Sequence, residues 1–215
     1  MSPTPTATSV RHTPPDPAWR RRVLRAALRT SFKWPSVLPL PVSWLRRGME
    51  WQAKLFPVRP GVRVLRTRLG GVPCEQLRPG VGRIRLHILH FHGGAFFTGS
   101  CATHRALAAD LAWRADAMVT RQALQRGGDA HRAGRPADDP RISPLLAPLH
   151  GLPPCLVQVG SDEILLDDAR RYAAQAQAAG CAVTLQEFPG YWHNFQMFAP
   201  LLRAADQAMD ALGEF

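Results

Sequence analysis

Cysteine is scarce in this 215-residue chain, and none of its cysteines forms a C-x-x-C pair. The spacing typical of zinc sites and of thioredoxin-like redox motifs is therefore missing. Isolated cysteines fit small apolar packing positions in a reducing, cytoplasmic compartment. We expect no metal and no organic cofactor. The cysteines are Cys74, Cys101, Cys155 and Cys181.

Long apolar runs are also missing. No stretch reaches the ~18 consecutive apolar residues of a transmembrane helix. Residues 1–16 are rich in proline and threonine and lack the apolar centre of a secretory signal. We interpret residues 1–16 as a disordered tail.

Acidic residues and lysine are few. The chain has 16 acidic residues against 27 basic ones, and its formal net charge is +11. Only Lys33 and Lys54 are lysines, so arginine supplies nearly all of the positive charge. A basic balance can indicate nucleic acid or an anionic membrane surface as a partner. Because no nucleic-acid-binding motif accompanies the scattered arginines, we expect a solvated basic surface and no nucleic-acid partner.

Residues 17–60 form a basic segment with helical spacing of its apolar residues. One interpretation is an amphipathic lid or a membrane-surface anchor, which implies possible weak membrane contact. The preferred interpretation is a pair of short helices packed on the domain as a cap. The apolar positions include Trp19, Val23, Leu24, Leu28, Trp44 and Trp51.

Residues 61–215 have the pattern of an α/β domain, in a chain that is 46% hydrophobic. Strands are predicted at residues 62–69, 72–77, 84–91, 155–159 and 183–188, and helices at 103–113, 163–179 and 200–212. A further strand begins at residue 117 and stops at 119. Residues 120–139 contain one large apolar residue, Leu124, and are interpreted as a linker-like junction.

The residues His92-Gly93-Gly94-Ala95 follow a predicted strand directly. Small residues at a strand end let backbone N–H groups turn toward a ligand, as a tetrahedral oxyanion requires. Loops of this H-G-G type form the oxyanion hole of α/β-hydrolase esterases and lipases.

Two further residues fit the same chemistry. Asp162 follows a buried strand, where a carboxylate could support an imidazole or simply cap the next helix. His193 lies in an aromatic loop after the last strand, about 30 residues later. The order of acid then histidine is that of the α/β-hydrolases.

Together these segments resemble the alpha/beta hydrolase fold-3 group, the hormone-sensitive-lipase-like esterases and lipases. The resemblance covers residues 62–119 and 139–215, and residues 17–60 resemble the group's helical cap. It implies an α/β-hydrolase fold and a small-molecule ester or acyl ligand. The implied roles are oxyanion-hole residues His92, Gly93, Gly94 and Ala95, triad acid Asp162, triad base His193, and substrate-binding residues Phe96, Phe97, Trp192 and Phe195.

The nucleophile elbow of that group, a G-D-S-A-G type of motif, is absent. None of the eight serines has glycine at both −2 and +2, and only 18 residues separate residue 119 from residue 138. A complete member would need roughly 80–100 more residues there, including the central strands. We therefore expect an incomplete fold and an inactive or strongly impaired ester hydrolase. The alternative is a non-catalytic pseudo-enzyme that binds an acyl ligand or a partner.

The absence of central strands leads to a first prediction, about stability. Unpaired strand edges and half-covered apolar faces favour aggregation and loose packing. We expect the purified chain to be poorly soluble or to unfold without a sharp transition. Differential scanning calorimetry with analytical ultracentrifugation checks this, and a single sharp cooperative transition of a monomer would contradict it.

Overall fold

The computed structural model describes residues 8–11, 16–33, 41–69, 71–80, 82, 84–91, 93, 99–122, 139–140 and 144–215. They fall in two units: unit 1 contains residues 1–21, 132–208 and 215, and unit 2 contains residues 22–131 and 209–214. Most of the predicted junction at residues 120–139 lies outside the described residues. Strand β5 (Ala117–Gln122) continues past the predicted strand end at residue 119.

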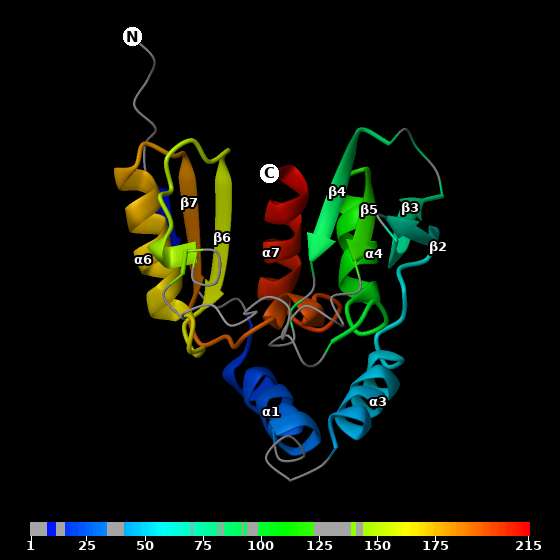
Figure 1. Cartoon of the computed structure of the whole chain (residues 1–215). Coiled ribbons are helices and arrows are strands. Elements are labelled where there is room, and N and C mark those ends of the chain that lie inside the picture. Colours follow the sequence, from blue (N-terminus) through cyan, green and yellow to red (C-terminus); the bar gives the residue numbers. More distant parts are fainter. Residues whose placement is uncertain are drawn as a thin grey trace. The chain divides into compact units, whose positions relative to one another are not determined.

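Unit 2 contains a four-stranded mixed sheet with strand order β2-β3-β5-β4 (Figure 1). β2 (Val62–Leu69) and β3 (Val72–Pro79) form the predicted antiparallel hairpin, in which Gly71 takes a positive φ of 81°. β4 (Leu86–Phe91) runs parallel to β5, with helix α4 (Arg105–Arg114) between them in the chain. This βαβ connection is the element from which parallel α/β sheets are built.

Helix α4 packs on this sheet through alanines. Ala108, Ala109 and Ala112 are fully buried in one cluster with Leu77 of β3 and Val119 of β5. The guanidinium of Arg105 donates two hydrogen bonds, of 2.5 and 2.9 Å, to the buried carboxylate of Glu75. A bidentate pair of this kind compensates the burial of the charge and fixes the start of α4 over β3.

Unit 1 contains a parallel sheet with strand order β1-β7-β6. β6 (Cys155–Gly160) and β7 (Val183–Phe188) flank helix α6 (Leu166–Ala178) in the chain. A short 3₁₀ turn, η2 (Pro144–Leu146), precedes β6. The helix begins three residues later than predicted, because residues 161–165 form a turn. The buried residues of the core of this unit are Leu149, Val159, Ala173, Ala176, Cys181, Val183 and Leu185.

β1 (Thr8–Arg11) differs from the predicted disordered tail. It pairs in parallel with β7, with Thr8 opposite Thr184 and Arg11 opposite Glu187. The free edge of β7 offers backbone partners to any extended segment, and the β-branched Thr8 and Val10 favour an extended strand. In the part of the chain that the structure describes, the two sheets share no ladder, and β1 covers one edge of β7.

The basic segment contains helix α1 (Ala18–Leu28), a π-helical turn η1 (Arg29–Lys33) and helix α3 (Val42–Ala53). The predicted helices are therefore present, but their tryptophans are not packed on the domain. Trp19, Trp44 and Trp51 are 62%, 61% and 65% exposed. Within unit 1, Arg21 of α1 donates to the carbonyl of Gly190 at 3.4 Å.

The predicted closing helix is α7 (Arg203–Glu214), preceded by a 3₁₀ turn, η3 (Phe195–Phe198). Its start is capped by a residue far away in sequence. The carboxylate of Asp16 accepts hydrogen bonds from the amides of Arg203 and Ala204, at 3.0 and 3.1 Å, and from the hydroxyl of Tyr191 at 2.9 Å. Asp16 and Tyr191 are buried, so this cap connects the N-terminal segment to the core of unit 1.

Asp16 provides the second prediction. Replacement of Asp16 by alanine leaves two amides and a buried hydroxyl without their acceptor, so we expect the free energy of unfolding to fall by about 3 kcal/mol. Hydrogen exchange at the amides of Arg203 and Ala204 measures the loss at the cap itself. Asp16→Asn keeps an acceptor oxygen and should lose less; equal stability of the alanine variant and the parent would contradict the capping role.

The same carboxylate makes the effect depend on pH. Burial opposes ionisation of Asp16, but the hydrogen bonds from Ala204, Arg203 and Tyr191 outweigh it and lower the pKa of Asp16. The stabilisation is therefore present at neutral pH and is lost as the pH falls through this lowered pKa.

Candidate active site

The site in unit 1 is built where β6 ends beside the loop that follows β7. The amide of Ser161 donates to the carbonyl of Phe188 at 3.0 Å, and the amide of Asp162 donates to the carbonyl of Tyr191 at 2.9 Å. At Gly160 the backbone of Tyr191 approaches so closely that a Cβ atom would overlap its carbonyl. Glycine is therefore required at the end of β6, and the two loops are held together by backbone atoms.

Ser161 reinforces this connection with its side chain. Its hydroxyl accepts a hydrogen bond from the amide of Gly190 at 2.7 Å and donates to a carboxylate oxygen of Asp162 at 2.8 Å. The hydroxyl of Ser161 is thus used to join the two loops.

The acid that contacts His193 is Glu163. Nδ1 of His193 lies 2.6 Å from one carboxylate oxygen of Glu163, and the other oxygen accepts the amide of Gly160 at 2.7 Å. The Glu163 side chain is 7% exposed and that of His193 is 58% exposed. The sequence analysis paired His193 with Asp162; in the structure Asp162 is exposed and bonded to Ser161, and the longer side chain of Glu163 reaches the imidazole.

The loop that carries His193 is fixed on both sides. Asn194 adopts a left-handed conformation with φ 57° and ψ 31°, which is uncommon for a residue with a side chain and is tolerated best by asparagine. Phe195 follows it and is buried, 4.8 Å from the ring of Phe188 and 5.3 Å from that of Tyr191. The aromatic cluster of Phe188, Tyr191 and Phe195 anchors the loop. The left-handed backbone of Asn194 changes the direction of the chain between His193 and this cluster.

This arrangement sets the protonation of the imidazole. The hydrogen bond to Glu163 raises the pKa of His193, although desolvation opposes the effect. When the imidazole is neutral, the carboxylate favours the tautomer with the proton on Nδ1, which leaves Nε2 as an acceptor. Among the described residues Nε2 has no hydrogen-bond partner, so His193 has the form of a general base.

A cavity of about 790 Å³ lies beside the Glu163–His193 pair, and both residues line it. Its other walls come from consecutive residues of β6, from α6 and from η2. Leucines and a tyrosine supply the apolar part, and Gln158, Gln196 and Arg171 supply polar groups. A mostly apolar cavity with a few polar groups and a histidine suits a small acyl compound. The predicted ligand contacts Trp192 and Phe195 are not among its lining residues.

The predicted oxyanion loop is largely outside the described residues. This applies to His92, Gly94, Ala95, Phe96 and Phe97, while Gly93 is described and exposed. Their roles remain predictions.

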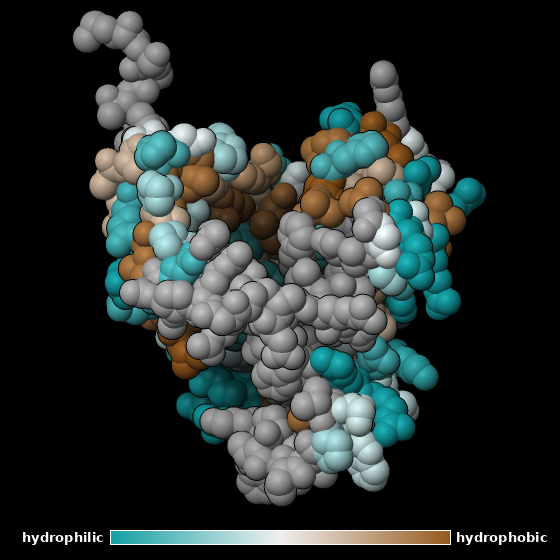
Figure 2. Space-filling view, in the orientation of Figure 1, coloured by the Kyte–Doolittle hydropathy of each residue, from teal (hydrophilic) through white to brown (hydrophobic). Residues whose placement is uncertain are grey.

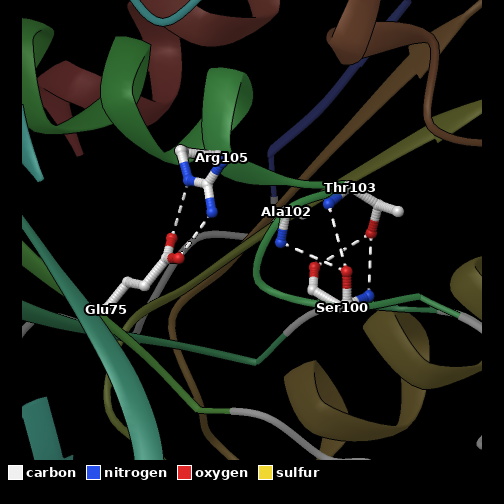
Figure 3. A network of polar contacts seen from close by, with 5 residues as sticks. All are labelled: Glu75, Ser100, Ala102, Thr103 and Arg105. Atoms are coloured by element: carbon white, nitrogen blue, oxygen red, sulfur yellow. Dashed lines mark hydrogen bonds and ion pairs between the residues drawn. The ribbon is translucent and has the colours of Figure 1, made fainter. Parts of the chain in front are cut away.

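Residues 99–104 follow that loop and belong to unit 2. Figure 3 shows the hydrogen bonds of Ser100 in this segment. The hydroxyl of Ser100 accepts hydrogen bonds from the amides of Ala102 and Thr103 at 3.2 and 3.4 Å. The hydroxyl of Thr103 accepts the amide of Ser100 at 2.8 Å and lies 2.9 Å from Nδ1 of His104. These residues are buried apart from Ala102, and they cap the turn that leads into α4.

Among the described residues, no group of three or more histidine, cysteine, aspartate or glutamate side chains is placed to hold a metal ion. No described helix combines the length and the apolar character needed to cross a membrane.

Known proteins resemble this chain in sequence and in fold. A family model of the alpha/beta hydrolase fold matches residues 113–197, a range that includes Asp162, Glu163 and His193. An esterase of Acinetobacter venetianus is 29% identical over 292 alignment positions, which cover 92% of this chain and 96% of that esterase. An acetyl-hydrolase of Streptomyces hygroscopicus is 37% identical over 116 positions, covering 50% of this chain and 39% of that protein.

The crystal structure of an esterase from the bacterial hormone-sensitive lipase family superposes with a TM-score of 0.82 at 22% identity, covering 93% of this chain and 98% of that one. The fold is therefore that of an α/β-hydrolase, which confirms the predicted fold class. Within this class, the chain is similar to the alpha/beta hydrolase fold-3 group, the hormone-sensitive-lipase-like esterases.

The two adjacent acids provide the third prediction. Glu163→Gln removes the charge beside the imidazole, so we expect the pKa of His193 to fall toward the ordinary value of ~6.5. Because the raised pKa favours folding at low pH, this variant also loses stability mainly below that ordinary value. The titration of the imidazole protons by NMR measures the pKa.

Asp162→Asn is the matched control, because it removes an equal charge one residue away. We expect the pKa of His193 to stay raised in this variant. A fall in the Asp162 variant but not in the Glu163 variant would restore Asp162 as the partner of the histidine.

Proposed function

We propose that this chain is a carboxylic ester hydrolase by family that lacks the nucleophilic serine, and that it binds a small ester or acyl ligand beside His193. The observation that carries the proposal is the hydrogen-bonded Glu163–His193 pair at the wall of a 790 Å³ cavity. An imidazole oriented by a carboxylate, with Nε2 open, is the acid–base part of a hydrolase triad.

The proposed roles follow from the contacts. His193 acts as the base and Glu163, instead of Asp162, orients and stabilises its protonated form. Gly94 and Ala95, with Gly93, supply the oxyanion donors and His92 shapes their loop. Phe96 and Phe97 contact the acyl or alcohol part of the ligand, as the family resemblance implies.

The nucleophile is the missing part of the triad. Within the described residues no serine, threonine or cysteine hydrogen-bonds His193. Ser100 caps the turn before α4, and Ser161 bridges two loops. The alignment with the Acinetobacter esterase has 292 positions, and this chain has 215 residues, so at least 77 positions (292 − 215) face no residue here. This supports an internal gap of the size expected for the elbow and the central strands.

Without a nucleophile no acyl-enzyme forms, and two outcomes remain. Nε2 of His193 can accept a proton from a water molecule that attacks the ester directly, which retains at most a rate enhancement on the order of 10³ over water. The alternative function is binding alone, in which the cavity holds an acyl ligand and the chain acts as a pseudo-enzyme.

The fourth prediction tests the absence of a nucleophile. With p-nitrophenyl butyrate we expect no burst of p-nitrophenol, and with a fluorophosphonate probe we expect no covalent adduct in the intact mass. Any remaining steady-state hydrolysis should rise as the pH passes the pKa of His193, since only the neutral imidazole accepts a proton.

His193→Ala is the control for this assay, because it removes the base and leaves every serine in place. Loss of residual hydrolysis in this variant supports attack by water. A fluorophosphonate adduct on the parent chain, mapped to a serine by peptide mass spectrometry, would show that a nucleophile exists, and Ser100→Ala and Ser161→Ala would then be compared.

A further inference from the structure

Helix α3 exposes its apolar side. Trp44, Trp51 and Leu55, just past its end, are 61%, 65% and 69% exposed, whereas Leu45 and Met49 are half-buried. Positions 44, 48, 51 and 55 are separated by four, three and four residues, so they share one face of the helix. We call the residues Trp44, Gly48, Trp51 and Leu55 the tryptophan stripe.

The position of Gly48 shows that this face is open. A Cβ atom built on Gly48 would meet no atom within 4 Å. Gln52, four residues after Gly48, lies at the edge of this face and donates a hydrogen bond of 2.8 Å from its side-chain amide to the carbonyl of Ser31 in η1. The half-buried residues Leu45, Met49 and Gln52 lie on the neighbouring side of the helix, which leaves the stripe to solvent.

Positive charge borders the stripe. Arg47 lies one helical turn from both Trp44 and Trp51, and its guanidinium carbon is 5.9 Å from the ring centre of Trp44. Lys54 lies one turn beyond Trp51 on the same border. From Val42 to Leu55 the only acidic residue is Glu50. A row of exposed indoles beside cations complements a surface that is apolar inside and anionic outside.

Helix α1 repeats this composition. Trp19 and Val23, one turn apart, are 62% and 61% exposed, and Ala26 and Ala27 on the same face are exposed as well. The helix carries four arginines, Arg20, Arg21, Arg22 and Arg25, and no acidic residue. Both helices of the basic segment therefore show apolar side chains together with positive charge.

We propose that α3 docks on an anionic lipid bilayer, lying in the plane of the headgroups with the tryptophan stripe inserted and Arg47 and Lys54 on lipid phosphates. Indole rings partition to the headgroup level of bilayers because they combine an apolar body with an N–H donor. In Figure 2 hydrophilic and near-neutral residues lie side by side over α3, as at such an interface. A nucleic acid would use the cations but would gain nothing from Leu55. The proposal is independent of the ester hydrolase function.

Vesicle binding by the full chain tests the proposal. We expect sedimentation with vesicles of phosphatidylglycerol and phosphatidylcholine but not with phosphatidylcholine alone, and release at high salt. Trp44→Ser/Trp51→Ser should weaken the partition coefficient by about tenfold or more. Arg47→Glu/Lys54→Glu should weaken it by a similar factor or more, since each cation near the surface contributes about fivefold.

Two matched controls distinguish binding through this surface from binding caused by net positive charge or by any exposed aromatic side chain. Arg63→Glu/Arg68→Glu changes the net charge equally on strand β2, and Phe215→Ser removes an aromatic side chain that is 63% exposed. Both should bind vesicles as the parent does, with circular dichroism showing that all variants keep their helices. Equal loss of binding in the β2 variant would overturn the proposal. So would binding to heparin or DNA without binding to vesicles, or a dimer that the tryptophan substitutions dissociate in the absence of lipid.

Discussion

The carboxylate of Glu163 connects every part of the candidate site. One oxygen accepts the amide at the end of β6 and the other accepts the imidazole of His193, so both oxygens have a donor. A nearly buried carboxylate is stable only when its acceptors are satisfied in this way. The arrangement holds because Gly160 lets the backbone of Tyr191 come close enough for the two loops to share hydrogen bonds. A larger residue at Gly160 would push away the backbone of Tyr191 and, with it, the loop that carries His193.

The sequence predicted strands β2, β3, β4, β6 and β7, the start of β5, and the loop of His193, because buried strands and glycine-rich ends leave periodic patterns. It paired His193 with Asp162, whereas in the structure Glu163 lies against the histidine; two acids follow β6, and a linear pattern does not show which side chain turns toward the imidazole. Phe195 was expected to contact ligand, but it packs on Phe188 and Tyr191. In the sequence, an aromatic residue after a strand looks the same whether it contacts a ligand or packs on other aromatic rings. Nothing local in the proline-rich tail indicates that Asp16 caps α7 or that Thr8–Arg11 forms a strand.

The cavity in unit 1 follows the edge of β6. Four consecutive residues of this strand, Leu156 to Val159, line it, although side chains alternate between the two faces of a strand. Side chains from both faces of a strand can line one cavity only where that cavity runs along the edge of the strand. In the part of the chain that is described, β6 pairs with β7 alone, so its other edge is open. Parallel strands are ordinarily covered on both sides. The open edge of β6 thus leaves the histidine beside a broad, partly apolar groove.

The cap of α7 by Asp16 bridges 187 residues of sequence. During synthesis, Asp16 leaves the ribosome long before α7 does, so the contact cannot form until Arg203 and Ala204 have emerged. At ordinary elongation rates of about 5–20 residues per second, this delay is on the order of ten seconds or more. Throughout that interval Asp16 lacks these donors, because Tyr191 and the start of α7 have not yet been made, and the nascent chain is open to chaperones and proteases. The emergence of α7 therefore completes the core of unit 1.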